Sequence, residues 1–492
     1  MEQTFRDDQI FVGGIWQKGR GAPITSHFAA DGSVNTTISG ASADDVEQAI
    51  ARARDAQPAW GALKPHERAT VLYRISEGLA SNIERIGWVQ SRDTSKSLAE
   101  TRALATSAAA TFRYFAAVAE TSDDLLTVPR GDYTTASIHE PLGLVAAITP
   151  WNSPIASDAQ KVAPALAAGN AVLLKPASWS PLVSLELARI AEEAGLPQGL
   201  LSVLPGSGRE VGNLLVEHRD IAKVSFTGGT STGRKLAHAA AEKLMPVSLE
   251  LGGKSPTIVF DDCDVDLAIA GILFGIFSSS GQSCIAGSRL FVQRSIYDAF
   301  VERLVTATEA LSVGHPFEAT TQVSSLVHLD HRDSVESYVA TARDEGGTIL
   351  CGGTRPKDPA LQAGAYYMPT IIAGLANTAQ TCREEIFGPV LVVIPFEDEA
   401  DVIAQGNDND YGLACGIWST DHRRCQRIAR AIQAGTVWIN TYKQFSISTP
   451  FGGDGDSGMG REKGRAGLRA YQRQKSIYED MSGNPHPWAR WP

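Results

Sequence analysis

Short apolar runs that alternate with longer helical segments dominate the chain from about residue 140 onward. Four of these runs are rich in Val, Leu or Ile and end near a glycine or a proline, which is typical of buried β-strands. They are Gly143–Thr149, Ala171–Lys175, Leu201–Leu204 and Lys223–Thr227. Strands that alternate with helices indicate a parallel, doubly wound α/β sheet, in which ligands bind beyond the carboxyl ends of the strands.

The segment between the second and third runs carries helix boundaries. Ser180 is expected to be the N-cap, Pro181 fits the first turn, and Gly195 followed by Pro197 ends the helix. The same alternation resumes after Gly253 with five more strand candidates. They are Thr257–Phe260, Arg289–Gln293, Val390–Phe396, Leu413–Ser419 and Gly435–Asn440. A second α/β domain is therefore expected.

The amino-terminal part has a different pattern. Ser42-Ala-Asp-Asp45 resembles a capping box that opens a helix running to about Trp60, and more helix follows to about Ala119. Residues 125–140 carry strand formers around a Gly-Asp turn, which predicts a β-hairpin that projects from the body. The three prolines and two tryptophans of residues 484–492 predict a non-helical tail.

The composition describes a chain with ample apolar material and an acidic balance. Its 492 residues, 43% apolar and 20% charged, predict two or three domains. The net charge of −11, without a dense Lys/Arg block, weighs against nucleic acid or an anionic membrane as a partner. The longest apolar stretch, Ala268–Phe277, is too short to span a bilayer, and the first residues contain no apolar run. A cytoplasmic protein is the resulting expectation.

The six cysteines form no CxxC pair and have no metal-ligand spacing with histidine, so no metal site is expected. Those at positions 263, 351, 382, 415 and 425 are interpreted as reduced, buried thiols. The sixth, Cys284, ends the polar loop Ser278-Ser-Ser-Gly-Gln-Ser-Cys284, which presents a thiol rather than packing it. A lone cysteine is more often an inert small hydrophobe than a nucleophile, so this loop alone leaves both interpretations open.

Three further motifs follow predicted strands, and each has two interpretations. In Thr149–Pro154, Asn152 could donate its amide to an oxyanion, although a turn residue between two prolines is the better interpretation of this motif alone. The Gly-rich turn Phe226–Gly233 suits a phosphate or nicotinamide at a helix N-terminus, or simply a tight turn. In Leu249–Lys254, Glu250 is either a general base with a raised pKa or a paired structural carboxylate.

Taken together, the motifs remove much of this ambiguity. Seven of them occur in one order: TPWNSP at Thr149–Pro154, LLKPAS at Leu173–Ser178, FTGG at Phe226–Gly229, LELGGKSP at Leu249–Pro256, GQSC at Gly281–Cys284, EEIFGPV at Glu384–Val390 and PFGG at Pro450–Gly453. In this order and spacing the chain resembles the aldehyde dehydrogenase superfamily over nearly its whole length. The resemblance implies oxidation of a small-molecule aldehyde to its carboxylate, with hydride transfer to a nicotinamide dinucleotide.

The resemblance also implies roles for three catalytic residues. Cys284 would attack the aldehyde carbon as a thiolate, and the Asn152 amide with the Cys284 backbone N–H would hold the oxyanion. After hydride transfer, Glu250 would activate the water that hydrolyses the thioester. Two alternatives stay open: an enzyme that passes the acyl group to CoA, and a non-catalytic binding protein on the same fold. Glu250 argues against the first, and the presence of all three residues argues against the second.

For the cofactor, the resemblance implies ribose contacts from Lys175 and Glu385, with Phe387 packing beside the latter. Further cofactor contacts are expected from Trp151, Phe226, Gly228, Gly229 and Gly233. The position three after Lys175 is often Glu in relatives that prefer NAD, but it is Ser178 here. NAD is therefore expected as the cofactor, with NADP accepted as well. A second departure is the acidic Asp454-Gly-Asp456 after PFGG, where the superfamily commonly has a lysine.

The substrate tunnel and the domain plan complete what the resemblance implies. Ser153, Ser157 and Gln160 would share one helical face of a roomy, neutral-polar tunnel, with Phe445 opposite and Ile285 beside the thiol. The fold would be aldehyde-dehydrogenase-like α/β, built from three parts. They are a Rossmann-like cofactor domain (residues 1–120 and 142–249), an α/β catalytic domain (250–469) and an oligomerisation arm with the C-terminal tail (121–141 and 470–492). Because an exposed hairpin edge needs a partner strand, a homodimer or homotetramer is expected.

Overall fold

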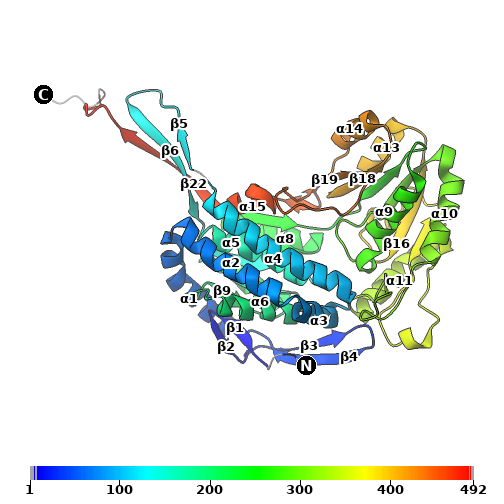
Figure 1. Cartoon of the computed structure of the whole chain (residues 1–492), viewed down its shortest axis with the longest axis horizontal. Coiled ribbons are helices and arrows are strands. Elements are labelled where there is room, and N and C mark those ends of the chain that lie inside the picture. Colours follow the sequence, from blue (N-terminus) through cyan, green and yellow to red (C-terminus); the bar gives the residue numbers. More distant parts are fainter. Residues whose placement is uncertain (1–4, 6–7, 123, 487, 489–492) are drawn as a thin grey trace.

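The computed structural model describes residues 5, 8–122, 124–486 and 488. Two α/β bodies lie side by side, and a narrow arm projects from the first of them (Figure 1). This arrangement confirms the predicted α/β class. Of the expected tail, residues 481–486 form no helix, whereas residues 487 and 489–492 lie outside the described part of the chain.

The first body is built on an eight-stranded sheet. In order across the sheet its strands are β2 (Ile15–Gln17), β1 (Ile10–Val12), β9 (Leu201–Val203), β8 (Ala171–Lys175), β7 (Leu144–Ile148), β10 (Ile221–Thr227), β11 (Val247–Glu250) and β21 (Gly458–Met459). Strands β9 to β11 are mutually parallel, and β1, β2 and β21 add antiparallel edges. The four strands predicted from the apolar runs are its centre. They are buried almost throughout because helices cover both faces.

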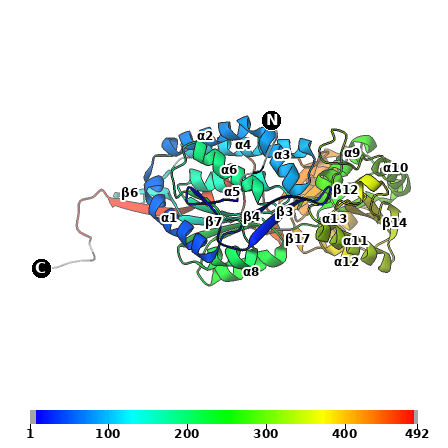
Figure 2. The ribbon, with the colours of Figure 1, turned by 90° about the horizontal axis from the view of Figure 1, so that it is seen from below.

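Helices surround this sheet in two layers on one side and one on the other. They are α1 (Ala43–Ala62), α2 (Pro65–Ser81), α3 (Ile83–Thr94), α4 (Leu98–Glu120), α5 (Pro154–Ala167), α6 (Leu182–Glu193), α7 (Asn213–Glu217) and α8 (Thr230–Ala241), with a π-turn η1 (Gly208–Gly212) before α7. In Figure 2, α5 and α6 lie on one side of the sheet and α1 and α8 on the other. Helices α2 to α4 pack over α5 and α6 as an outer layer.

Local sequence signals explain where these helices begin. Helix α1 opens on the predicted capping box, in which Ser42 Oγ accepts a bond from Asp45 N–H and the Asp45 carboxylate accepts from Ser42 N–H. The prediction for α6 was wrong by one residue. Its N-cap is Pro181, and the Leu182 N–H is capped from a distant helix by the Asp93 carboxylate at 2.8 Å. A cap supplied by another element leaves no local sequence signal.

The second body is built on a seven-stranded sheet. Across it run β14 (Thr348–Cys351), β15 (Thr370–Ala373), β16 (Val390–Phe396), β13 (Arg289–Gln293), β12 (Pro256–Val259), β18 (Ala414–Trp418) and β19 (Thr436–Ile439). All pairs except β14 with β15 are parallel. The five predicted strands are present, each within a residue of its expected bounds.

Two apolar layers cover this second sheet. One includes residues of α9 (Val265–Phe277) and α10 (Tyr297–Glu309); the other includes residues of α11 (Leu329–Asp344), α12 (Gln380–Arg383), α13 (Glu399–Asn407) and α14 (His422–Ala431). Short 3₁₀ turns are η2 (Ser278–Gly281), η3 (Arg294–Ile296) and η4 (Pro359–Leu361). Two small antiparallel pairs are β3 (Pro23–Phe28) with β4 (Ser33–Ser39), and β17 (Tyr411–Gly412) with β20 (Asp454–Gly455). Within the described residues, no helix combines the length and apolar character needed to cross a membrane.

The arm is a three-stranded antiparallel sheet. It contains β5 (Leu125–Thr127), β6 (Tyr133–Pro141) and β22 (Gln472–Asp480), with β6 in the middle. Helix α15 (Gly464–Arg469) leads the chain back to it. The predicted hairpin therefore pairs with the C-terminal strand β22, and the sheet stands clear of the body (Figure 1).

Candidate active site

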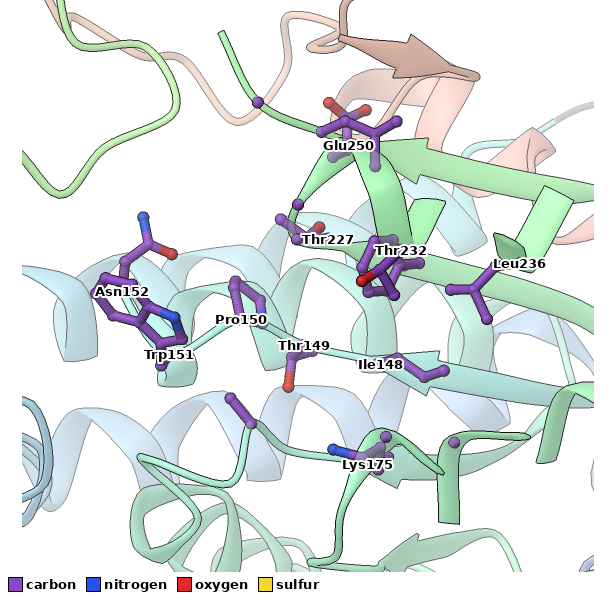
Figure 3. A pocket seen from close by; sticks show the side chains of 18 of the residues that line it. Ile148, Thr149, Pro150, Trp151, Asn152, Lys175, Thr227, Thr232, Leu236 and Glu250 are labelled. Atoms are coloured by element: carbon purple, nitrogen blue, oxygen red, sulfur yellow. The ribbon is translucent and has the colours of Figure 1, made fainter. Parts of the chain in front are cut away.

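A large hollow lies where the first sheet meets the second body. It is a cavity of about 790 Å³ at the carboxyl ends of β8, β7, β10 and β11. Figure 3 shows Lys175, Thr149, Thr227 and Glu250 in turn at the ends of these four strands. Ten of the twelve residues predicted for catalysis and cofactor binding line the cavity: Trp151, Asn152, Lys175, Phe226, Gly228, Gly229, Glu250, Cys284, Glu385 and Phe387.

The floor of the cavity is the Gly-rich turn between β10 and α8. The Gly228 N–H donates to the Glu250 carbonyl at 3.0 Å, which fixes the turn against the next strand. A Cβ added at Gly229 would meet nothing within 4 Å, so the backbone here borders open space at the N-terminus of α8. An open backbone surface at a helix N-terminus, in a cavity of this size, fits a dinucleotide.

Two residues predicted for the cofactor lie elsewhere. Gly233 does not line the cavity; a Cβ there would lie 2.4 Å from Leu251, so glycine lets α8 pack closely against the chain after β11. Ser178 does not line it either, and its hydroxyl donates to the Gly206 carbonyl at 3.1 Å. Both residues shape the wall from behind rather than facing the hollow.

Lys175 closes the far end of the cavity. Its side chain is buried and its Nζ donates to the Pro176 carbonyl at 2.9 Å. Burial lowers the pKa of Lys175 to about 8. Because an ammonium has three donors, the remaining N–H groups are available to ribose hydroxyls or a phosphate.

An aromatic wall closes the other end. The rings of Trp151 and Phe387 meet edge to face at 5.1 Å, and His331 lies 5.2 Å from Trp151. Phe387 has a left-handed backbone with φ of 57°, rare for an aromatic residue, and its carbonyl is 2.8 Å from His331 Nε2. Trp179 also lines the cavity. His331 and Trp179 were missed from the sequence, because neither belongs to a recognisable motif.

Cys284 reaches the cavity from the second body. Its loop begins with Ser279 and Ser280, both in left-handed conformation, and the Asn152 side-chain amide donates to the Gln282 carbonyl at 3.0 Å. This bond ties the loop after β7 to the loop that carries the thiol, and it leaves the second amide hydrogen of Asn152 for a ligand (Figure 3). Burial, with Glu385 and Glu250 nearby, raises the pKa of the Cys284 thiol to about 12.

Two buried carboxylates face the same cavity. Neither oxygen of Glu250 has a hydrogen-bond partner among the described residues, and burial together with Glu462 raises the pKa of Glu250 well above its usual value. Glu385 accepts a bond from the Gly253 N–H at 3.0 Å, and burial raises its pKa to about 7. An unpartnered carboxylate with a raised pKa is suited to accept a proton near neutral pH.

The residues predicted for the substrate tunnel lie outside this cavity. The hydroxyl of the N-cap residue Ser153 is 3.2 Å from that of Ser157 in the first turn of α5, and the tunnel face that these residues were expected to share stays a prediction. Ile285 packs in the same small apolar cluster as Cys284. Phe445 is about half exposed and lines a separate hollow with Trp438 and Phe451. Gln160 is partly buried, and its contact with a tunnel stays a prediction.

The acidic loop after PFGG has a structural explanation. Asp454 pairs with Arg461 at 3.0 Å, and Asp456 pairs with Arg234 of α8. The two aspartates therefore fasten the loop beside the cofactor turn. The next residue, Ser457, is buried just before β21, and its Oγ donates to the Gly252 carbonyl at 2.7 Å.

A presented thiol, an amide donor and two buried carboxylates around a dinucleotide-sized hollow are typical of an oxidoreductase with covalent catalysis. The sequence matches the Aldehyde dehydrogenase family over residues 16–477. The betaine aldehyde dehydrogenase of Brucella melitensis is 41% identical over 480 residues, which are 97% of this chain and 98% of that protein. That of Bacillus subtilis is 38% identical over 97% of this chain and 99% of its own.

Solved structures give the same result. The betaine aldehyde dehydrogenase of Staphylococcus aureus in complex with NAD⁺ matches with a TM-score of 0.96 and 34% identity, covering 99% of this chain and 97% of that one. A putative aldehyde dehydrogenase from Burkholderia cenocepacia has the same TM-score at 38% identity, with coverage of 99% and 100%. The chain belongs to the aldehyde dehydrogenase family. It is an NAD-dependent enzyme that oxidises an aldehyde.

Proposed function

We propose that Cys284, Asn152 and Glu250 carry out this oxidation in the cavity described above. Cys284, its proton lost to solvent, attacks the aldehyde carbon and forms a C–S bond, and the carbonyl electrons move to oxygen. The free amide hydrogen of Asn152 and the Cys284 backbone N–H hold that oxyanion. NAD, when bound, supplies the acceptor for the hydride that leaves the same carbon. The carbon is then a thioester on Cys284.

The unpartnered carboxylate of Glu250 supports the hydrolytic half of the reaction. Water attacks the thioester carbon while Glu250 takes one of its protons, the C–S bond breaks, and the carboxylate product leaves with Cys284 free. The raised pKa of Glu250 suits a base that must accept this proton near neutral pH. Because Lys161 and Glu462 form a buried ion pair close behind Glu250, that glutamate's charge opposes ionisation of Glu250. The unpartnered carboxylate of Glu250 is the observation that most favours water over CoA as the acceptor of the acyl group.

For the cofactor, we infer that Lys175 and Glu385 bind the two riboses and that Trp151 and Phe387 pack at the nicotinamide end. NADP is accepted besides NAD, because no carboxylate stands at Ser178 to repel a 2′-phosphate. The hydroxyl of Ser178 is already committed to the Gly206 carbonyl, so it supplies space rather than a new bond. Lys175 and the cavity-lining Arg209 supply positive charge near it.

Formation of NADH with a panel of aldehydes, with and without CoA, tests this function. Betaine aldehyde belongs in the panel, since the relatives above carry its name. We expect turnover that does not need CoA and a free carboxylic acid as product. A product found only as acyl-CoA, or no turnover with any aldehyde, would contradict the hydrolytic mechanism.

We also propose that the chain forms a homodimer or homotetramer through its arm. Strand β5 leaves one edge of the three-stranded sheet unpaired, and Leu126 and Val128 beside it are 85% and 90% exposed. Exposed apolar side chains on a free strand edge favour pairing with a second chain. Sedimentation of the whole protein, compared with a Leu126→Lys variant, tests this. The domain division into residues 1–120 with 142–249, 250–469, and 121–141 with 470–492 stays a prediction, which limited proteolysis can test.

A further inference from the structure

Two lysine side chains, Lys443 and Lys463, lie near the thiol of Cys284 but outside the dinucleotide cavity, and a third, Lys96, lies near Lys443. Lys96 and Lys463 are buried, and Lys443 is partly exposed. None of the three lines the cavity. In the part of the chain that the structure describes, no carboxylate lies within ion-pair distance of their Nζ atoms. These three side chains therefore form no ion pair in the described part of the chain, although the charge of Glu100 acts on Lys96 and Lys443 and that of Glu462 on Lys463.

Lys443 is the lysine most directly linked to the thiol loop. Its Nζ donates to Ser278 Oγ at 2.8 Å and lies 5.8 Å from the ring centroid of Phe274. Ser278 begins the loop that ends at Cys284, so the ammonium stands at the base of the loop that presents the nucleophile. Its field reaches the sulfur, because Lys443 lowers the pKa of the Cys284 thiol against the larger effect of burial.

Lys463 approaches the thiol from another direction. Its Nζ lies 3.9 Å from the ring centroid of Phe445 and 5.3 Å from that of Phe451. Both rings line the second hollow, of about 410 Å³, and Phe451 packs in the same apolar cluster as Cys284. The backbone of Lys463 is left-handed, with φ of 58°, a conformation that a long side chain rarely adopts. A cation therefore lies against two of the aromatic rings that line this second hollow, and one of these rings packs with Cys284.

The carboxylates in this neighbourhood are already engaged. One oxygen of Glu100 accepts bonds from the Ser279 N–H at 2.6 Å and the Ser279 hydroxyl at 3.1 Å, and the other accepts from Ser97 Oγ at 3.1 Å. Glu462, the neighbour of Lys463 in the chain, is paired with Lys161. The charges of both carboxylates act on the nearby lysines, but neither carboxylate forms an ion pair with one of them.

Buried charges in proteins are almost always paired, because an unpaired ammonium in a low-dielectric site loses hydration without compensation. Here the missing partner can come from the substrate. We propose that the aldehyde this enzyme oxidises carries a carboxylate, as a semialdehyde does, and that Lys443 with Ser278 binds that group while Lys463 and Lys96 add to the attracting field. The proposal rests on the proposed function, since it places the anion in the aldehyde that Cys284 attacks.

The polar face of α5 is consistent with this substrate class. On the α5 side, Ser153 and Ser157 offer no aromatic ring to a quaternary ammonium, which aromatic rings bind best, and on the other side the rings of Phe445 and Phe451 already face the Lys463 ammonium. Two or three ammonium groups would moreover repel a cationic aldehyde. The site therefore discriminates by charge, favouring an anionic over a neutral aldehyde and a neutral over a cationic one.

Steady-state kinetics with charge-matched aldehydes tests the proposal. Succinate semialdehyde and butanal have the same chain length, as do glutarate semialdehyde and pentanal, and betaine aldehyde supplies the cation. We expect kcat/KM for at least one semialdehyde to exceed that of its neutral counterpart by at least about tenfold. Lys443→Gln should lower this anionic-to-neutral ratio by at least about tenfold through KM for the anion, and Lys443→Arg should restore most of it.

Two further readouts separate recognition from a general loss of activity. Lys357→Gln, which removes an exposed lysine of the second body, should leave the ratio as in the parent. Burial and the charge of Lys96 lower the pKa of Lys443 to about 7, and Glu100 and Cys284 also act on this amine. The anionic-to-neutral ratio should therefore fall as the pH rises through about 7, because the neutral amine no longer attracts an anion.

Three results would overturn the proposal while leaving aldehyde oxidation intact. They are a parent ratio of one or below for both pairs, a ratio that Lys443→Gln does not change, and a preference for the cationic aldehyde. A parent that oxidises none of the aldehydes would instead contradict the proposed function itself. The two failures are thus distinguishable in one set of assays.

Discussion

The two sides of Cys284 differ in charge. Toward the dinucleotide cavity stand two buried carboxylates, Glu250 and Glu385, whose pKa values burial raises. Outside that cavity stand Lys443, at the base of the thiol loop, and Lys463, whose pKa values burial lowers. On both sides burial disfavours the charged form of these groups, and none of the four forms an ion pair in the part of the chain that the structure describes. The difference indicates that one side handles a proton and the other side recognises an anion.

The largest effect should follow from removing the sulfur of Cys284, which lies between the two sides. Cys284→Ala should lower aldehyde oxidation at least about 1,000-fold, because no other thiol lies in the cavity. NAD binding, followed by protein fluorescence or calorimetry, should stay within about threefold of the parent. Cys263→Ala, on the half-exposed thiol of the second body, is the matched control and should keep full activity. Turnover of Cys284→Ala within about tenfold of the parent would refute the thioester mechanism.

The next effect concerns the oxyanion that forms between the two sides. Asn152→Ala removes the free amide hydrogen and also the bond to the Gln282 carbonyl, and we expect kcat to fall about 100-fold or more. The KM for NAD should change little, since the cofactor turn is on another strand. Asn484→Ala in the exposed tail serves as control. If kcat and the KM for NAD deteriorate together, Asn152 acts on the local fold instead.

A pH profile tests the proton-handling side. A raised pKa means that Glu250 is protonated, and inactive as a base, at low pH; the thiolate of Cys284 is likewise favoured by high pH. Turnover with a neutral aldehyde should therefore rise about tenfold per pH unit on the acid limb and level off only above neutrality. A profile that is flat from about pH 6 upward would mean that neither group limits the reaction.

The smallest effect concerns the cofactor end. Ser178→Glu should lower the NADP-to-NAD ratio of kcat/KM by at least about tenfold, because a carboxylate repels the 2′-phosphate. Ser178→Ala is the matched control: it removes the hydroxyl bonded to the Gly206 carbonyl without adding charge, and the ratio should stay close to the parent's. Equal losses with both cofactors in Ser178→Glu would show that the residue acts only on the turn.

The central strands and the residues that line the main cavity were predictable, because both are recorded in local sequence. Buried parallel strands are continuous apolar runs, Glu250 and Asn152 each sit in a motif at a strand end, and Cys284 sits in the motif that follows α9 and η2. What the sequence could not show depends on distant contacts. The cap of α6 comes from Asp93 in another helix, and His331 reaches the cavity from α11 without any motif.

The expected neutral tunnel illustrates the same limit. From Ser153, Ser157 and Gln160, which are neighbours on one helix, the approach to the thiol was predicted to be neutral and polar. That neutral tunnel stays a prediction, whereas the lysines that we propose for anion recognition come from elements far apart in the chain, Lys443 after β19 and Lys463 before α15, and only the fold brings them near Cys284. Charge at a site is the sum over all elements around it, so a single helical face predicts it poorly.

The central claim is that a thioester forms on Cys284 and that Glu250 is needed only to hydrolyse it. Rapid mixing of Glu250→Gln with NAD and aldehyde, followed by acid quench and mass spectrometry, tests it most directly; Glu479→Gln on the exposed strand β22 is the control. We expect a burst of NADH equal to the enzyme sites, turnover slowed about 100-fold or more, and an acyl group on Cys284 alone. A variant without a burst, or an acyl group on any other residue, would contradict the claim.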